Sequence, residues 1–171
     1  MNFDTLYHQH KDLVYNLALN YVQNVQDAEE VTQDVFVSVY KSLEKFRKEA
    51  KITTWLYRIT INKSLDLIKK QKRKKRFGFV TNLFYDNSNE VRYEQPMFNH
   101  PGVEMEHKEA LERLFGCINK LPPNQKTALI LTKIEDKSQA ETAEIMQTSV
   151  KAVESLLQRA KKNLAKYLNT P

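Results

Sequence analysis

Hydrophobic residues recur at intervals of three and four along most of the chain, the spacing that places them on one face of a helix. The first such run extends from Phe3 to Tyr21, and residues 24–26 interrupt it. The segment Asp27-Ala28-Glu29-Glu30 resembles a capping box, so we expect a second helix from Asp27 to about Lys45. Its buried stripe should consist of Val31, Val35, Val39 and Leu43.

A third helix is predicted from Thr53 or Thr54 to Arg76, because a threonine hydroxyl can cap a first helical turn. Trp55, Leu56 and Ile59 give its first two turns an apolar face. The later turns are polar, and seven of the eight residues from Lys69 to Arg76 are Lys or Arg.

Residues 77–107 lose this periodicity and contain a series of turn-forming residues, among them Gly78, the run Asp86-Asn87-Ser88-Asn89, and Pro96, Pro101 and Gly102, so we interpret them as an interdomain linker. The segment is acidic, and its aromatic residues either dock on a partner or fold back on a domain. Helices resume at Lys108 and stop at Pro122-Pro123, and a further helix is expected from Asn124 to Ile134. Ser138 with Glu141 predicts a capping box that opens a short helix to Met146.

Ser149 then caps a final helix that ends near Leu168. A short helix, a tight turn and a longer basic helix are typical of a helix-turn-helix. The chain has 171 residues, 41% of them hydrophobic and only three glycines, a composition that favours helices over sheets. The prediction is therefore an all-α fold of two small helical domains, residues 1–76 and 108–171, joined by the flexible linker 77–107.

The net charge of +6 favours an acidic partner. The single cysteine, Cys117, excludes an internal disulfide and lies among apolar neighbours typical of a buried, inert thiol. The first twelve residues do not resemble a signal peptide, and no stretch approaches the roughly 18 uncharged apolar residues of a membrane span. We therefore expect a cytoplasmic protein.

The sequence offers no catalytic constellation. His8, His10, His100 and His107 are scattered without metal-ligand spacing, and no glycine-rich phosphate loop is present. We expect a binding protein rather than an enzyme, with no cofactor and no metal.

The candidate chemistry is recognition of nucleic acid. In the final helix, Arg159 could bond a guanine edge, Gln158 an adenine edge, and Lys162 a phosphate. The basic end of the third helix suits a single strand held by aromatic faces and cations, because the same helix carries Trp55, Tyr57, Arg58 and Asn62 upstream. The alternative to the helix-turn-helix is an ordinary amphipathic helix pair, and the alternative for the basic run is a set of solvated surface charges. On the second helix, Phe36 and Tyr40 either form an exposed docking face or turn inward in the bundle.

The two halves together resemble the extracytoplasmic-function sigma factors, group four of the bacterial sigma-seventy family. The first half resembles region two through the segments Asp27-Ala28-Glu29-Glu30-Val31, Gln33-Asp34-Val35-Phe36, Phe46-Arg47 and Thr54-Trp55-Leu56-Tyr57-Arg58-Ile59, with Asn62 and Asp66. The second half resembles region four through Leu121-Pro122-Pro123, Ala143-Glu144-Ile145-Met146, Ser149-Val150-Lys151-Ala152-Val153-Glu154-Ser155 and Arg159-Ala160-Lys161-Lys162-Asn163-Leu164.

This resemblance implies a factor that binds core RNA polymerase and directs promoter-specific initiation at minus-ten and minus-thirty-five elements. The residues implied at the minus-ten element are Phe46, Arg47, Lys48, Lys51, Thr54, Trp55, Arg58, Asn62, Lys63, Asp66, Lys69 and Lys70. Those implied at the minus-thirty-five element are Ser149, Lys151, Ala152, Glu154, Ser155, Gln158, Arg159 and Lys162. Gln33, Asp34, Phe36, Val37 and Tyr40 would bind the beta-prime coiled coil of the polymerase.

The resemblance also implies a beta-flap contact, regulation by an anti-sigma factor, and an acidic linker that threads the polymerase as an RNA mimic. Two residues depart from the family pattern. Lys48 stands where many relatives have Gly in the base-capture loop. Gln147 stands where Gly is frequent in the helix-turn-helix turn, so its backbone should adopt a left-handed or a bridge conformation, at some strain. The alternative functions are a stand-alone helix-turn-helix repressor or activator, and a pure interaction module such as an anti-sigma or scaffold protein.

Overall fold

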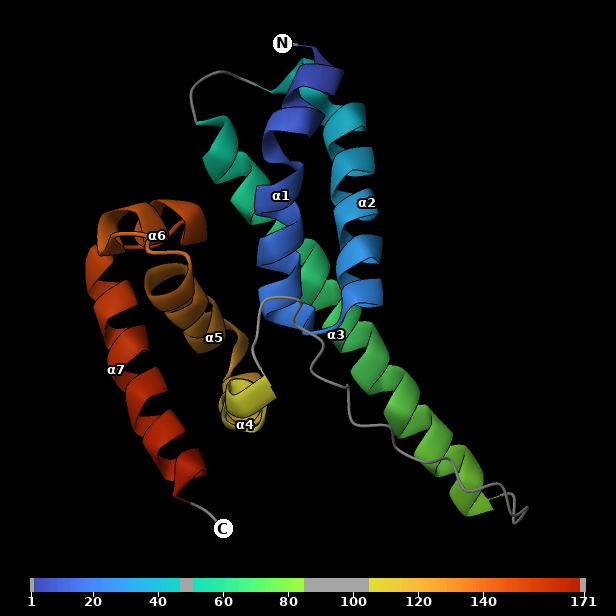
Figure 1. The fold of residues 1–171 in the computed structure, drawn as a ribbon, viewed down its shortest axis with the longest axis vertical. Coiled ribbons are helices and arrows are strands. Elements are labelled where there is room, and N and C mark those ends of the chain that lie inside the picture. Colours follow the sequence, from blue (N-terminus) through green and yellow to red (C-terminus); the bar gives the residue numbers. More distant parts are fainter. Residues whose placement is uncertain (1, 47–50, 85–104, 170–171) are drawn as a thin grey trace. The chain divides into compact units, whose positions relative to one another are not determined.

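The computed structural model describes residues 2–46, 51–84 and 105–169 (Figure 1). All regular elements in these ranges are helical, which confirms the predicted fold class. Contacts divide the chain into two compact units, one of residues 1–45 and 59–99 and the other of residues 46–58 and 100–171. The long third helix contributes its first turns to the second unit and its remainder to the first.

The first unit begins with two packed helices, α1 (Phe3–Val22) and α2 (Val25–Ser42), followed by a short 3-10 turn, η1 (Leu43–Lys45). Gln23 ends α1 in a left-handed conformation with φ of 61°. The side chain of Asn24 then caps α2 and accepts from the Asp27 backbone N–H at 2.8 Å. The core between the helices includes the fully buried side chains of Leu6, Val14, Leu17, Val35 and Val39.

The predicted start of α2 at Asp27 is wrong by two residues. Asn24 is an equally good capping residue and lies one position before the first helical residue, so the helix begins earlier. Asp27 is consequently the third helical residue, and its carboxylate is free to accept from the amide of Asn24 at 2.6 Å.

The third helix, α3 (Ile52–Phe84), is longer than predicted at both ends. The backbone N–H of Trp55 donates to the carbonyl of Lys51 at 3.2 Å, so Thr53 and Thr54 lie inside the first turn rather than at the cap. At the other end the helix continues eight residues past Arg76. Gly78 costs a helix only about 1 kcal/mol relative to alanine, and the first proline of the chain is Pro96, so nothing in this segment breaks the helix.

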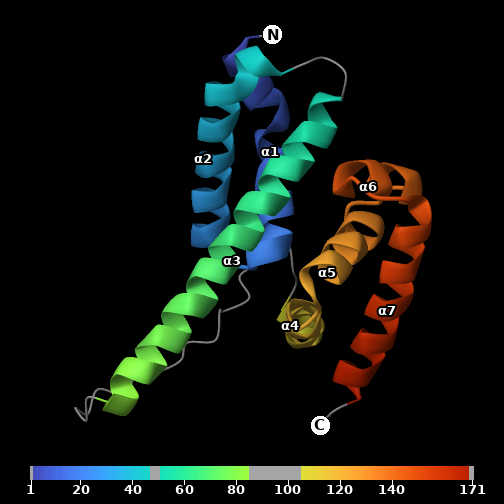
Figure 2. The ribbon, with the colours of Figure 1, turned by 180° about the vertical axis from the view of Figure 1, so that it is seen from behind.

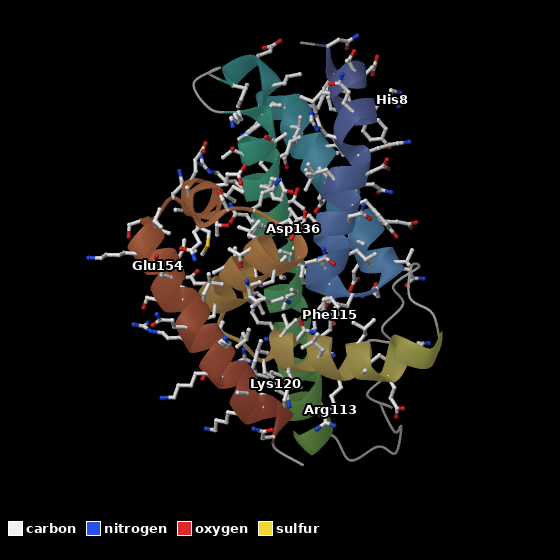
Figure 3. The ribbon with its side chains drawn as sticks, turned by 60° about the vertical axis from the view of Figure 1, so that its left-hand side comes forward. His8, Arg113, Phe115, Lys120, Asp136 and Glu154 are labelled. Carbon is white, nitrogen blue, oxygen red and sulfur yellow. The ribbon has the colours of Figure 1, made fainter. Side chains whose placement is uncertain are left out.

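In the second unit, α4 (Met105–Asn119), α5 (Pro123–Leu129) and α6 (Gln139–Met146) lie on one side of α7 (Val150–Leu168) (Figure 3). Tertiary contacts join α7 to each of α4, α5 and α6. The helix expected over 124–134 is α5 followed by one π-helical turn, η2 (Ile130–Ile134), and α4 begins three residues before Lys108. The core includes Ile118, Ala128, Leu131, Val153 and Ala160, and Cys117 is buried as predicted.

The helix-turn-helix forms as the sequence predicted. The Ser138 hydroxyl accepts from the Glu141 N–H at 3.1 Å while the Glu141 carboxylate accepts from the Ser138 N–H at 2.9 Å, which makes the capping box reciprocal. Gln147 ends α6 at φ 54° and ψ 47°, in the left-handed region, which is the first of the two conformations expected at this turn. The Ser149 hydroxyl then accepts from the Ala152 N–H at 3.1 Å and starts α7.

Candidate nucleic-acid interface

The predicted recognition face of α7 lies on the surface of the second unit. Val153 and Ala160 are fully buried, so the opposite side of the helix is free. Glu154 points away from the neighbouring helices in Figure 3. The exposed members of the predicted set are Ser149, Lys151, Glu154, Gln158, Arg159 and Lys162, whereas Ala152 and Ser155 are half-buried.

Two contacts from other helices hold α7 in place. The Arg113 guanidinium on α4 donates to the carbonyl of Leu168 at 2.9 Å, near the end of α7 (Figure 3). The Asn163 amide donates to the side chain of Gln125 on α5 at 2.9 Å. Neither contact involves a residue of the predicted recognition set, so both fix the helix without occupying the side chains of its recognition face.

The first turns of α3 carry polar groups that contact the helix-turn-helix within the second unit. The Thr54 hydroxyl donates to a Glu144 carboxylate oxygen at 3.3 Å. The Arg58 guanidinium donates to the carbonyls of Glu144 and Ile145 at 2.7 and 3.2 Å. Beside them, the rings of Phe46 and Trp55 lie 4.8 Å apart at 31°. These four side chains belong to the predicted minus-ten set, and the structure places them together.

Tyr57 lies among these residues; the sequence placed it beside the nucleic-acid candidates on this helix but not in the predicted minus-ten set. Its hydroxyl donates to a Glu135 carboxylate oxygen at 2.9 Å, and the Lys137 ammonium lies 5.0 Å from its ring centroid. Burial and the Glu135 carboxylate raise the pKa of the Tyr57 hydroxyl above its usual value, so the group remains a neutral donor. Tyrosine in an apolar helical register gives no sequence signal for such a partner.

The later turns of α3, in the first unit, present the remaining members of the minus-ten set. Asn62, Asp66, Lys69 and Lys70 are exposed, and Lys63 is half-buried. Lys51, in the second unit, is exposed just before the helix begins. Arg47 and Lys48 lie outside the described residues. The effect of Lys48, which replaces the glycine frequent in the base-capture loop of the family, is therefore not tested by the structure.

The predicted polymerase-binding face on α2 divides between surface and core. Gln33, Asp34, Val37 and Tyr40 are exposed, with 52% of Val37 and 68% of Tyr40 accessible. Phe36 is only 5% exposed, so its prediction as a docking side chain is wrong and the inward alternative holds for this residue. It turns inward because α1 offers it aromatic partners, and the ring of Tyr7 lies 4.7 Å from it.

The aromatic cluster on this face includes two residues that the sequence analysis did not assign to a site, Phe3 and Tyr7. The Phe3 ring meets the Tyr40 ring edge-on at 5.3 Å and the Phe36 ring at 6.4 Å. Edge-to-face pairs of this kind add about 1 kcal/mol to the burial of the rings. The spacing of four between Phe3 and Tyr7 placed them on one helical face, but only the pairing of α1 with α2 shows which residues they meet.

The described part of the chain shows neither a metal site nor a membrane-spanning helix. Residues 2–46, 51–84 and 105–169 hold no group of three or more His, Cys, Asp or Glu side chains placed to bind a metal ion. Within the same ranges, none of the helices combines the length and apolarity needed to span a membrane.

Comparison with known families assigns both halves. The model of sigma-70 region 2 matches residues 6–74, and that of sigma-70 region 4 matches residues 111–164. The two matches cover most of the chain in the order that the resemblance required. The chain belongs to the sigma-70 family. Within that family it is an extracytoplasmic-function factor, and it directs RNA polymerase to promoters at the start of transcription.

Relatives of this sigma factor agree in length and fold. It is 32% identical to the ECF RNA polymerase sigma-E factor of Haemophilus influenzae over 160 residues, which cover 93% of this chain and 83% of the relative. A solved structure of CnrH in complex with the cytosolic domain of CnrY aligns with a TM-score of 0.65 at 24% identity and covers 98% of this chain and 87% of that one. The sigma factor RpoE of Bartonella quintana, solved with the anti-sigma factor NepR, gives the same TM-score at 16% identity, with 98% and 97% coverage.

Sigma factors bind core RNA polymerase and promoter DNA, and as a class they are transcription initiation factors rather than enzymes. The stand-alone repressor or activator, in which the first half of the chain would dimerise or sense a signal, is not favoured, because that half matches sigma-70 region 2.

Proposed function

We propose that the two halves of this sigma factor divide promoter recognition between residues 1–76 and 108–171. The exposed face of α3 and its first turns take the minus-ten element, through the residues from Phe46 to Lys70 named above. The exposed face of α7 takes the minus-thirty-five element. The observation that best supports this division is the exposure of Asn62, Asp66 and Lys69 on α3 together with that of Gln158 and Arg159 on α7.

On α7, the long donors lie where they can reach base edges. A bidentate Arg159 suits guanine and a bidentate Gln158 suits adenine, while Lys162, one turn further, suits a phosphate. The partly buried Ala152 and Ser155 allow the helix to approach the groove closely. This arrangement follows the docking of a helix-turn-helix, in which the start of the second helix enters the major groove.

On α3, Trp55 and Phe46 offer aromatic faces for an unstacked base, and Arg58 and Thr54 offer donors next to them. These donors bind Glu144 and Ile145 in the free chain, so they must exchange those acceptors for groups of the promoter. Exchange of one acceptor for another changes the free energy little, because both states are hydrogen-bonded.

The polymerase contact is proposed on α2, through Gln33, Asp34, Val37 and Tyr40, which are all exposed. Such a contact places the protein with RNA polymerase and chromosomal DNA, so we propose the cytoplasm as its location. The structural neighbour solved with the anti-sigma factor NepR supports the proposal that an anti-sigma factor also regulates this chain. The linker predicted over residues 77–107 overlaps the end of α3 and the start of α4, and its remainder, residues 85–104, lies outside the described residues, so its role as an RNA mimic stays a prediction.

Transcription with purified core polymerase tests the proposal. Core enzyme plus this chain should initiate from promoters found by mapping transcript starts after its overexpression, and core enzyme alone should not. Initiation that does not depend on the chain, or binding of duplex DNA without polymerase as tight as with it, would overturn the proposed function.

A further inference from the structure

The face of α3 that turns toward α1 and α2 continues to Gln71. Ile61 and Ser64 are buried and Ile68 and Gln71 are half-buried, at successive intervals of three, four and three residues. This spacing follows one side of a helix. It predicts which residues beyond Gln71 lie on the same side and which lie opposite.

A polar contact ends this inward face and fixes the rotation of the helix about its axis. The Gln71 amide donates to a carboxylate oxygen of Asp27 on α2 at 2.8 Å, and the Asn24 amide donates to the same oxygen at 2.6 Å. An oxygen that accepts from two amides is held in position, and so is the turn of α3 that contains Gln71.

Beyond Gln71 the helix leaves the bundle. Lys72, Arg73, Lys74, Lys75 and Arg76 are all exposed. Figures 1 and 2, seen from opposite sides, show α3 continuing past the ends of α1 and α2. Because the helix is unbroken, the contact at Gln71 also sets the direction in which each of these five cations points.

Arg73 points to the side that carries the proposed DNA contacts. It follows Lys69, Asp66 and Asn62 by four, seven and eleven residues, and all three of these are exposed. Lys75 has the same relation to the inward face, because it follows Gln71, Ile68 and Ser64 by four, seven and eleven residues. The two cations are therefore on opposite sides of one exposed helix.

We propose that Arg73 is a further DNA-contacting residue, which binds a backbone phosphate of the duplex next to the minus-ten element, and that Lys75 has no such role. This assignment rests on the proposed function of α3. Eleven residues at a rise of 1.5 Å place Arg73 about 16 Å from Asn62 along the axis. One strand of a duplex covers that length with about five phosphates.

The chemistry of the side chain suits this role, since a guanidinium binds a phosphate through two parallel hydrogen bonds. We propose a duplex as the ligand because a duplex is a rigid rod, which can touch only one side of α3. A flexible single strand or RNA could instead follow cations on every side of the arm, and Arg73 and Lys75 would then contribute equally.

The test compares Arg73→Gln with Lys75→Gln, two single charge removals two residues apart at exposed positions. Binding of holoenzyme, formed from core polymerase and the full chain, to a fluorescent duplex promoter fragment is measured over a series of salt concentrations. Arg73→Gln loses one phosphate contact, so its affinity for the duplex should be about fivefold lower than that of the wild type at 0.15 M salt. The slope of log affinity against log salt concentration should decrease in magnitude by about one. Lys75→Gln should bind like the wild type, and Arg73→Lys should retain most of the slope.

A second variant tests the role of the contact at Gln71. Gln71→Ala removes the contact with Asp27 that sets the direction of Arg73, but it leaves the net charge unchanged. It should weaken binding to the duplex, as Arg73→Gln does, while circular dichroism shows a native helix content. Equal losses for Arg73→Gln and Lys75→Gln, or no loss for either, would overturn the assignment of Arg73 while leaving promoter binding by the wild type intact. A wild-type holoenzyme that fails to bind the promoter at all would instead overturn the proposed function on which the assignment rests.

Discussion

Arg159 is the side chain on α7 whose predicted contact is easiest to isolate. It is exposed, so Arg159→Ala should leave the stability unchanged. Loss of a bidentate contact to a guanine should cost about 1–3 kcal/mol in promoter binding and relax the preference at one base pair. The measurement is holoenzyme binding to promoters substituted one position at a time in the minus-thirty-five element.

Lys161→Ala is the matched control, because it removes the same charge from an exposed position outside the predicted recognition set. It should lower affinity for all promoter variants by a similar small factor. Equal base preference in Arg159→Ala and the wild type would show that Arg159 does not read sequence.

Tyr40 is expected to anchor the polymerase contact. With 68% of the residue exposed, its ring contributes to folding mainly through the edge-on contact with Phe3, so Tyr40→Ala should lose only about 1 kcal/mol of stability and should remain folded in the binding assay. Truncation of an aromatic residue at the centre of an interface typically costs 2 kcal/mol or more, so affinity for core enzyme should fall by about thirtyfold. Tyr40→Phe keeps the ring against Phe3 and should retain binding.

Titration of core enzyme with labelled chain measures both variants. Unchanged affinity of Tyr40→Ala would remove α2 from the proposed polymerase contact. Phe36→Ala should behave differently, because its buried ring contributes to folding and the variant should lose stability.

Glu141 gives the stability of the second unit a predictable pH dependence. Hydrogen bonds from Ser138 hold the pKa of the Glu141 carboxyl below its ordinary value of 4.5. A group whose pKa is lowered by folding stabilises the native state above its unfolded pKa, and this contribution is lost as the pH falls through the folded pKa. The difference in melting temperature between the wild type and Glu141→Gln should therefore be present at pH 7 and vanish on acidification below the folded pKa.

Thermal unfolding from pH 7 to pH 3 measures this difference. Glu109→Gln, at an exposed position of α4, is the control and should show a smaller change with pH. A constant difference between the wild type and Glu141→Gln across this range would mean that the carboxylate charge plays no part in the cap.

Gln147 sets the turn between α6 and α7, and its left-handed backbone is costly for a side chain with a Cβ. Gln147→Gly should relieve that cost and stabilise the second unit by up to about 1 kcal/mol. Gln158→Gly, inside α7, should destabilise it by about the same amount. Chemical denaturation of each variant checks the signs, and destabilisation by Gln147→Gly would show that the side chain itself holds the turn.

The helices themselves were largely predictable because their signals are local. The periodic apolar positions placed seven helical segments, and Ser138, Glu141 and Ser149 marked the starts of α6 and α7 correctly. Errors occurred where two local signals competed. Asn24 and Asp27 are both good capping residues, and the polar end of α3 lacks an apolar stripe although it contains no residue that stops a helix.

The candidate site was predictable in its residue types but not in its contacts. Exposure of Gln158 and Arg159 followed from the periodicity of α7, since a residue opposite Val153 faces solvent. Burial of Phe36 by Phe3 and Tyr7, and the contact of Gln71 with Asp27, depend on which helices pack together. Periodicity along one helix carries no information about that choice, so these contacts were missed.

Two exposed helical faces, one on α3 and one on α7, suit a protein that contacts two separate promoter elements. The order of the two family matches agrees with the predicted division of the chain into residues 1–76 and 108–171, which stays a prediction. A division of labour between the two faces also implies that damage to one of them should leave the contact of the other intact.

Footprinting of the holoenzyme on a mapped promoter, with probes for both duplex protection and unpaired thymines, tests that division most directly. Arg159→Ala should lose protection upstream, at the minus-thirty-five element, and keep melting at the minus-ten element once the complex is saturated. Asn62→Ala should keep the upstream protection and lose melting. Loss of both signals together in each variant would contradict recognition of two elements by two separate helical faces.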